Sequence, residues 1–445
     1  MRMDDLDRKI LALAVPALGA LIAEPIFLLT DTAMIGHLGA EALASLGLSS
    51  TVLTTVIGLL IFLAYATTPI VARRVGAGQL AQAISAGVDG VWLALFLGVV
   101  LGLTGGVLTR PVVELFPATS VVQAGAIDYL SISWWGLPAM LVVIAATGLF
   151  RGLQDTTTPL VIAVWGFMAN AALNALLIYG LGLGLIGSAW GTVLAQWGMA
   201  LVFVVLISRK VRTEKAGAKP GLLGIQQAAR SGGWLFLRTL SLRVALVATV
   251  LVATTLGTTE LAAWHIVFTI FSLLALALDA LAIAGQALIG HDLGRGNVPE
   301  VRRVTNRLVS WGFLSGGVLA IAMGSLTPLV PLVMTSDSAV RAAVWPVLII
   351  LALSLPLSGF VFVLDGILIG AGDGKYLALT GLLNVAAFAP FLLLASMVVL
   401  DVEGTNLGGL LMLQVAFGVG YIGARALTLG LRARGNKWMV PGESR

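Results

Sequence analysis

The sequence contains no cysteine, which excludes disulfide bonds and metal sites built from thiolates. It is also poor in charge: charged residues make up 11% of the 445 positions, against about 25% in soluble globular proteins. Hydrophobic residues make up 59%, and the mean hydropathy is +1.02. This composition predicts a polytopic membrane protein. The formal charge of +5 then indicates basic loops beside a membrane rather than binding to nucleic acid.

The signatures of several enzyme classes are absent. There is no G-x-x-x-x-G-K-[ST] loop for nucleotide phosphates and no G-x-S-x-G nucleophile motif. The three histidines, His37, His265 and His291, do not pair with carboxylates at the spacing of metal ligands. We therefore expect no enzymatic activity, no cofactor and no resident metal. If the chain is a transporter, an ion gradient must drive it.

Long apolar runs predict twelve membrane-spanning helices, because a helix needs about 20 mostly apolar residues to cross a bilayer. The runs are too long and unbroken for the alternating strands of an outer-membrane barrel. The expected spans are 10–34, 44–69, 85–108, 122–149, 157–180, 186–208, 232–256, 262–290, 304–325, 343–369, 376–400 and 405–431.

Basic residues are distributed very unevenly between the two sides of these spans. Of the 26 Lys and Arg, only Arg110 and Arg341 lie on the outer side, while Arg238 and Arg243 fall within the seventh span. All the others, including Arg425 near the C-terminus, are assigned to the side of both termini. Because positive residues accumulate in cytoplasmic loops, both termini are expected in the cytoplasm.

The chain repeats itself at a spacing of 218 residues. "LGAEALA" at 38–44, "VGAGQ" at 75–79 and "GLFRGLQD" at 148–155 correspond to "LGTTELA" at 256–262, "LGRGN" at 293–297 and "GILIGAGD" at 366–373. Six spans separate the copies, so both halves enter the membrane from the same side. Such parallel repeats enclose a central cleft in secondary transporters that work by alternating access. We therefore expect an N-lobe at 1–208, a basic cytoplasmic linker at 209–231 and a C-lobe at 232–445.

Two acids lie deep in the first span, in "IAEPIFLLTDTAMIGHLG". Glu24 and Asp31 are seven residues apart, almost two helical turns, and therefore lie near one face. Ionisable residues inside a membrane are costly and mark functional sites. A carboxyl group in a low-dielectric environment can take up and release a proton near neutral pH, and it can equally bind Na⁺. Pro25 between the two acids permits a bend in the helix.

Uncharged polar residues in the fifth and sixth spans can complete this site. Asn170 and Asn174 lie one turn apart, and Thr192 follows in the next span. With Asp31 they would form a small oxygen-lined site for a proton or a hard cation, weakly suited to Na⁺. The alternative is that they only join helices by hydrogen bonds, as polar residues often do in membranes.

The C-terminal half carries its own polar set, Arg238, Asp279 and Asp365. Because an unpaired buried charge is very costly, we expect Arg238 to form an ion pair with one of the two acids. A direct role in substrate binding is the alternative. Asp89 is a further intramembrane acid, whereas Asp155 and Asp373 end two repeat motifs and are expected to be helix caps or loop anchors.

Four segments, "DTAMIGHLGAEALA", "GLFRGLQDTTTPL", "NAALNALLIYGLGLGLIGSAWGT" and "FVLDGILIGAGDGKY", carry a resemblance to a known family. In their order and spacing they resemble the multidrug and toxic compound extrusion (MATE) family, and its DinF-like subgroup in particular, over about residues 8 to 430. The resemblance implies an all-α membrane fold of two six-helix bundles, V-shaped around a central cleft. It also implies export of cationic or amphipathic toxic compounds in exchange for H⁺ or Na⁺, by a monomer among the lipids of a bacterial inner membrane.

The resemblance also assigns residues to roles. The coupling carboxylate of the family falls on Asp31, and the polar positions of the fifth and sixth spans fall on Asn170, Asn174 and Thr192. Many DinF-like members carry a second acid where this chain has Asn174, so the departure favours H⁺ over Na⁺. A lipid-linked precursor flippase of the same superfamily is the main alternative, but its cleft should be strongly cationic. An integral-membrane transferase would need a histidine–acid constellation, which the sequence lacks.

Overall fold

The computed structural model describes residues 4–398, 401–402 and 405–442, and these residues are almost entirely helical. Its helices are α1 Asp5–Gly36, α2 Ala40–Leu60, α3 Phe62–Gly76, α4 Leu80–Glu114, α5 Ser120–Ser133, α6 Leu137–Gly152, α7 Thr157–Asn174, α8 Gly184–Thr213, α9 Leu222–Leu256, α10 Thr258–Gly294, α11 Val298–Leu326, α12 Val330–Met334, α13 Ser338–Gly370, α14 Gly374–Met397, α15 Leu407–Val415 and α16 Gly423–Arg434. A 3₁₀ turn, η1 Trp134–Gly136, and a π-helical turn, η3 Ala416–Ile422, interrupt two spans, and a second π-helical turn, η2 Ala175–Gly180, ends another. The two-residue strands β1 Asp401–Val402 and β2 Thr405–Asn406 form an antiparallel pair.

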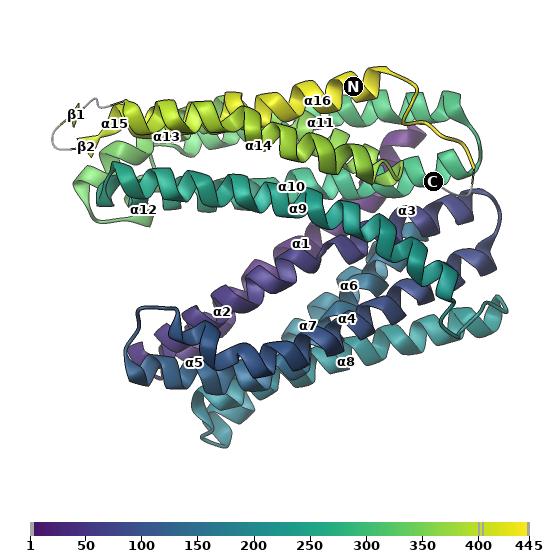
Figure 1. Ribbon diagram of the computed structural model, residues 1–445, viewed down its shortest axis with the longest axis horizontal. Coiled ribbons are helices and arrows are strands. Elements are labelled where there is room, and N and C mark those ends of the chain that lie inside the picture. Colours follow the sequence, from purple (N-terminus) through teal and green to yellow (C-terminus); the bar gives the residue numbers. More distant parts are fainter. Residues whose placement is uncertain (1–3, 399–400, 403–404, 443–445) are drawn as a thin grey trace. The chain divides into compact units, whose positions relative to one another are not determined.

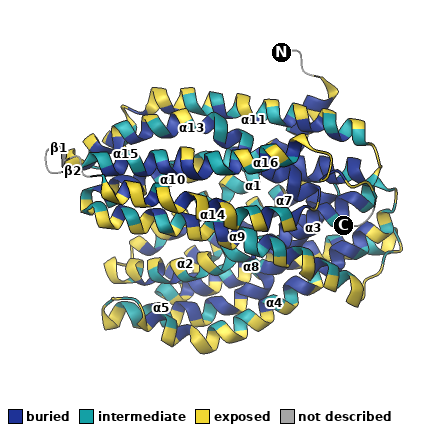
Figure 2. Ribbon diagram, turned by 45° about the horizontal axis from the view of Figure 1, so that its top comes forward, coloured by how far each residue is buried: buried dark blue, intermediate teal, exposed yellow. Residues whose placement is uncertain are grey.

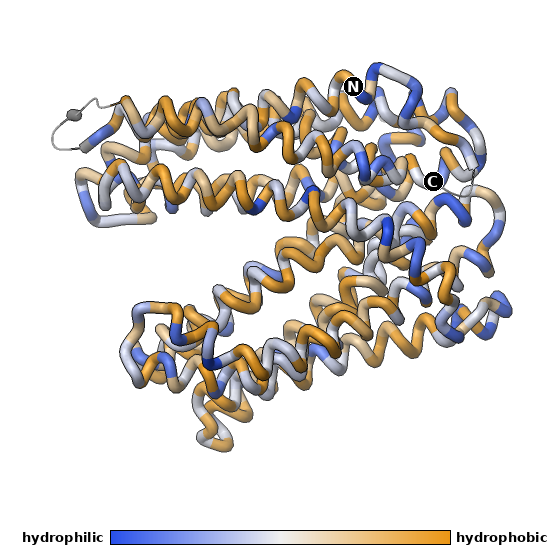
Figure 3. The backbone as a smooth tube through the Cα atoms, in the orientation of Figure 1, coloured by the Kyte–Doolittle hydropathy of each residue, from blue (hydrophilic) through white to orange (hydrophobic). Residues whose placement is uncertain are grey.

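The twelve predicted spans are confirmed. Twelve helical segments of the described chain are long and apolar enough to cross a membrane, from Asp5–Gly36 to Leu407–Arg434. Figure 3 shows hydrophobic residues along the helices and hydrophilic residues gathered mainly at the turns. Figure 2 shows exposed residues along many of the helices. Many large apolar side chains are among the exposed residues, such as Leu103 and Val107 of α4. Such surfaces suit contact with lipid.

The chain divides into two compact units. The N-terminal bundle comprises Ala12–Gly232, and the C-terminal bundle comprises Gly233–Pro441 together with the residues up to Leu11. The helices extend into the range predicted as a linker, so that only residues 214–221 lie between α8 and α9. This short connection is attached to α4, where Asp89 accepts a 2.7 Å hydrogen bond from the backbone N–H of Gly221. Asp89 therefore holds the connection in place.

The internal repeat is visible in the backbone. Gly39, Gly78 and Gln154 have positive φ angles of 120°, 77° and 62°, and their counterparts Gly257, Gly296 and Gly372 have 148°, 73° and 70°. These three pairs lie within the three sequence matches. Positive φ angles allow a chain to reverse at the end of a helix, which is why glycine occupies five of the six positions.

Each bundle is built around the same close helix crossing. In the N-terminal bundle α6 packs on α3 and α4, and in the C-terminal bundle α13 packs on α10 and α11 (Figure 1). A Cβ at Gly148 would lie 2.8 Å from the carbonyl oxygen of Ala64, and one at Gly366 would lie 2.5 Å from that of Ala282. The two glycines are thus required for the approach of the backbones, as at small-residue interfaces of membrane helices.

Candidate functional site

Asp31 is a buried carboxylate on α1, in the N-terminal bundle. It is 6% exposed, and its Oδ1 accepts hydrogen bonds from Asn174 Nδ2 at 2.7 Å and from Ser188 Oγ at 2.9 Å. Both donors are neutral. Among the described residues the carboxylate is therefore stabilised by hydrogen bonds and has no basic partner, an arrangement in which its charge can be gained and lost.

The amides of α7 continue this arrangement to α8. Asn174 Nδ2 also donates to Asn170 Oδ1 at 3.1 Å, and Asn170 Nδ2 donates to Thr192 Oγ1 at 3.0 Å. A chain of hydrogen bonds thus joins Asp31, Asn174, Asn170 and Thr192, the four residues that the sequence placed in one site. We call these four residues with Ser188 the Asp31 cluster.

The backbone around Asn174 is adapted to this cluster. Asn174 is the last residue of α7 and precedes the π-helical turn η2, a feature found often at functional sites. Opposite it on α8, a Cβ at Gly191 would lie only 2.0 Å from Asn174 Oδ1. That oxygen is buried and has no hydrogen-bond partner among the described residues. The described residues therefore leave a buried acceptor of the cluster, Asn174 Oδ1, without a hydrogen bond.

Sequence reasoning missed two members of this region. Ser188 lies one helical turn before Thr192 on α8, and this four-residue spacing was a usable signal. The phenol of Tyr129 on α5 is buried and lies near Ser188, Thr192 and Asp31. Nothing in the sequence around Tyr129 distinguishes it from an ordinary buried aromatic residue.

Glu24 is not brought into the Asp31 cluster. Its side chain is exposed, and it forms no hydrogen bond or ion pair with the described residues. Seven residues separate it from Asp31, which corresponds to about 10 Å along the helix. Pro25 lies inside α1, which stays continuous from Asp5 to Gly36. The missing N–H of Pro25 leaves a weak point in the helix two turns before Asp31.

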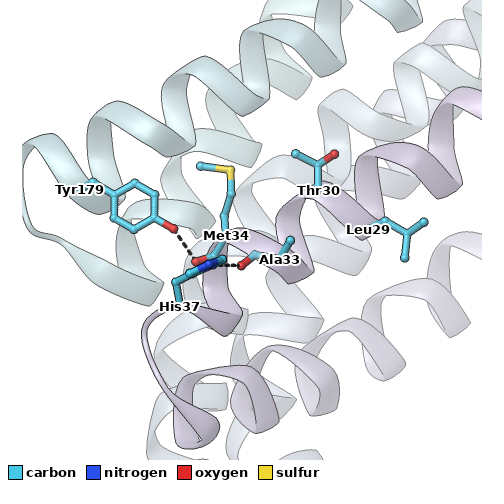
Figure 4. Close-up of a pocket in the computed structure, with 6 residues that line it drawn as sticks. All are labelled: Leu29, Thr30, Ala33, Met34, His37 and Tyr179. Carbon is cyan, nitrogen blue, oxygen red and sulfur yellow. Dashed lines mark hydrogen bonds between the residues drawn. The ribbon is translucent and has the colours of Figure 1, made fainter.

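A groove lies at the carboxyl end of α1, next to the cluster in sequence (Figure 4). Five residues of α1 and its end line it together with Tyr179 of η2: Leu29, Thr30, Ala33, Met34 and His37. The Tyr179 hydroxyl donates a 2.6 Å hydrogen bond to the carbonyl oxygen of Met34. The π-helical turn is thereby tied to the last turns of α1, close to Asp31.

The C-terminal bundle contains a buried ion-pair cluster. Arg238 of α9 pairs with Asp365 of α13, one of the two acids considered for it. Arg425 of α16 lies 3.0 Å from the other oxygen of Asp365, and Asp279 interacts electrostatically with Arg425. Asn384 and Tyr421 line the same small pocket. Two guanidinium groups therefore share one carboxylate.

This cluster corrects one assignment made from the sequence. The charge pattern of the sequence assigns Arg425 to the cytoplasmic C-terminal residues, but the structure places it, 8% exposed, inside the twelfth span. The reason is the buried carboxylate of Asp365 on a neighbouring helix, which the linear sequence does not reveal.

The two acids that end the repeat motifs have different partners. Asp155 accepts a 2.9 Å hydrogen bond from the backbone N–H of Thr158, at the start of α7, whereas Asp373 pairs with Arg432 at 2.7 Å.

Comparisons with known proteins agree with this architecture. The MatE family model matches residues 16–176 and 236–391, once in each half. Protein DETOXIFICATION 44, chloroplastic, of Arabidopsis thaliana is 30% identical over 397 residues, covering 83% of this chain and 73% of that protein. DNA damage-inducible protein F of Escherichia coli is 26% identical over 416 residues, covering 87% of this chain and 85% of that protein.

A solved structure shares the fold. It is described as the outward-facing conformation of a multidrug resistance MATE family transporter, with a TM-score of 0.85 and 22% identity. The match covers 97% of this chain and 96% of that one. With a family model that matches both halves and relatives that span most of the sequence, the chain belongs to the MatE family of multidrug and toxic compound extrusion transporters.

Proposed function

We propose that this protein is a secondary active antiporter that exports cationic or amphipathic toxic compounds in exchange for H⁺. The observation that carries the proposal is the Asp31 cluster. It contains one carboxylate, which is buried within a membrane span and receives hydrogen bonds from neutral donors alone among the described residues. A buried acid without a basic partner is suited to binding a proton on one side of a membrane and releasing it on the other.

The cluster favours H⁺ over Na⁺ as the coupling ion. Asn174 supplies an amide where a second carboxylate would complete an anionic cage for Na⁺. Oδ1 of Asp31 already receives two hydrogen bonds, and Oδ2 receives none from the described residues. We therefore expect the proton to bind at Oδ2, where it displaces no existing donor.

Proton binding would drive the transport cycle through α1. Protonation removes the charge of Asp31 and allows this part of α1 to pack in a drier environment, with Pro25 as the bending point. A cationic substrate then loses a favourable charge in the N-terminal bundle and leaves. Such a switch works only when the proton has a higher affinity for the bent form than for the straight form.

Transport in proteoliposomes tests this function. An imposed pH gradient should drive export of a cationic dye, and an imposed Na⁺ gradient alone should not. Asp31→Asn should fold and bind dye but lose export driven by the pH gradient. Asp128→Asn is a matched control, because Asp128 is an exposed acid on α5. Full export by Asp31→Asn would contradict the proposed role of Asp31.

We further propose that the protein is a monomer in a bacterial cytoplasmic membrane, with both termini in the cytoplasm. The uneven distribution of Lys and Arg between the two sides of the spans supports the orientation, whereas the monomeric state and the bacterial membrane rest on the family resemblance. Because the chain has no cysteine, Ala218→Cys and Ser336→Cys each introduce a single exposed thiol. An impermeant thiol reagent added to intact cells should label Cys at 336 and spare Cys at 218. Labelling of Cys at 218 but not of Cys at 336 would contradict the proposed orientation.

A further inference from the structure

The first turn of α1 is attached to α11 by a buried carboxylate. The Asp7 side chain is 1% exposed, and it accepts hydrogen bonds from Arg307 Nε at 2.6 Å and from Trp311 Nε1 at 2.8 Å. It also accepts one from the backbone N–H of Asp4 at 2.9 Å, and Asp4 itself pairs with Arg303 at 2.7 Å. Breaking a buried, hydrogen-bonded ion pair is strongly unfavourable, so this attachment is firm.

The helix that carries Asp7 belongs to both bundles. Residues up to Leu11 belong to the C-terminal bundle, and Ala12 and the residues after it belong to the N-terminal bundle, within one unbroken helix. Asp31 follows Asp7 by 24 positions, which is about 36 Å along an α-helix. A single continuous helix thus connects Asp31 to the turn that is attached to α11.

In the internal repeat α9 is the counterpart of α1, and it too is shared between the two bundles. Its residues up to Gly232 belong to the N-terminal bundle, and those from Gly233 onward belong to the C-terminal bundle. Within the N-terminal bundle, Gln227 accepts a 3.4 Å hydrogen bond from Arg74, and Gly221, just before α9, donates to Asp89. Each half of the chain therefore begins with a helix whose first turns are held by the other half.

We propose that Asp7, held by Arg307 and Trp311, is the anchor through which a change at Asp31 reaches the C-terminal bundle. This inference rests on the proposed function, in which α1 responds to protonation of Asp31. If the first turns of α1 were free, a bend in the helix would move only its own end. With Asp7 held, the same bend must displace α11. The anchor stays closed throughout the cycle, and it acts by position without touching the substrate.

Amide hydrogen exchange of the full-length protein tests this transmission directly. Asp7→Asn should accelerate exchange over residues 5–16 by about tenfold or more, as expected when a local structure loses a buried charge pair. Asp5→Asn should not, because Asp5 lies in the same turn but forms only an exposed pair with Arg8 at 3.9 Å. This comparison isolates the anchor from a general effect of charge.

The decisive comparison is the response of α11 to Asp31→Asn. In the otherwise unchanged protein, Asp31→Asn should change the rate of amide hydrogen exchange in α11. In the Asp7→Asn background, Asp31→Asn should leave that rate unchanged. An equal response in both backgrounds, or no response in either, overturns the proposal. These outcomes do not depend on the coupling ion. If Asp31→Asn retains full proton-driven export, the proposed function fails while the exchange data still decide the role of Asp7.

Cross-linking distinguishes a permanent anchor from a gate that must open. Asp7→Cys and Trp311→Cys can be joined by a short bifunctional thiol reagent, since the chain offers no competing cysteine. The unreacted double variant should export dye at well under half the normal rate, and cross-linking should restore at least half of it. Abolition of export by the cross-link would show that the attachment opens during the cycle and would refute the proposal.

Discussion

Ser188 donates a buried hydrogen bond of 2.9 Å to Asp31, which links the first span to the sixth. The same Asp31 oxygen accepts the amide of Asn174 from the fifth span. Three helices therefore meet at one carboxylate oxygen. Because each donor contributes separately to the position of the carboxylate, the cluster can be tested one residue at a time.

Removal of the hydroxyl donor should weaken the cluster without abolishing it. Ser188→Ala should lower the free energy of unfolding by about 1 kcal/mol, the usual contribution of one hydrogen bond. Proton-driven export should slow while dye binding is retained, because Asn174 still holds the carboxylate. Thermal unfolding in detergent and proteoliposome transport measure both effects. Ser208→Ala, at an exposed position of the same helix, should change neither, and an equal loss in both variants would argue against a role for Ser188.

A second acid should alter the choice of coupling ion. Asn174→Asp places two carboxylates beside the oxygens of Asn170 and Thr192, a set that suits a hard cation. Export driven by an imposed Na⁺ gradient should then appear or increase. The measurement is dye transport at constant pH with Na⁺ replaced by choline in the reference sample. Unchanged ion dependence would mean that residue 174 does not select the ion.

The packing of Gly191 against Asn174 leaves no room for a methyl group. Gly191→Ala would place a Cβ 2.0 Å from Asn174 Oδ1, so the amide must move or the helices must separate. Such overpacking typically costs about 1–3 kcal/mol. Gly198→Ala on the same helix meets no atom within 4 Å and should be neutral or slightly stabilising. Lower thermal stability and slower export for Gly191→Ala alone would support the geometry, and equal behaviour of the two variants would refute it.

Two equivalent turn positions of the internal repeat carry different residues, and each can be substituted separately. Gln154 and Gly372 share a left-handed backbone, with φ angles of 62° and 70°. Gly372→Ala should cost about 1 kcal/mol, because a Cβ is disfavoured in this conformation, and Gln154→Gly should be neutral or stabilise by up to about 1 kcal/mol. Gly106→Ala is the control, as it lies in a helix with open space around it. Thermal unfolding decides, and a stabilising Gly372→Ala would contradict the prediction.

The shared carboxylate of the C-terminal bundle should matter more than either of its arginines. Asp365→Asn removes the charge that faces both Arg238 and Arg425, and it should cost about 3–5 kcal/mol. Arg425→Gln should cost less, because Arg238 still pairs with Asp365. The double variant Asp365→Asn with Arg425→Gln should be more stable than Asp365→Asn alone. Strict additivity of the two single effects would show that Arg425 and Asp365 do not interact.

Much of the architecture could be predicted from the sequence, because it depends on properties of local segments. The length and apolarity of each run determine whether a helix can cross a bilayer, and all twelve spans were predicted in this way. The repeat was visible for a similar reason: a reversal of the chain needs a residue that tolerates positive φ, so Gly39, Gly78 and their counterparts occur in recognisable motifs. Asp31 stood out because burying an acid in a membrane is costly.

The remaining features depended on which helices meet, and only the tertiary structure decided them. Ser188 is one of many hydroxyl residues until α8 places it beside Asp31, and Arg425 looks like a terminal cytoplasmic charge until α13 brings Asp365 to it. Glu24 has the same chemistry as Asp31 but is left exposed. Asp7 becomes an anchor because α1 crosses from one bundle to the other. A residue type specifies which interactions a side chain can make, whereas the packing of the helices determines which of them it does make.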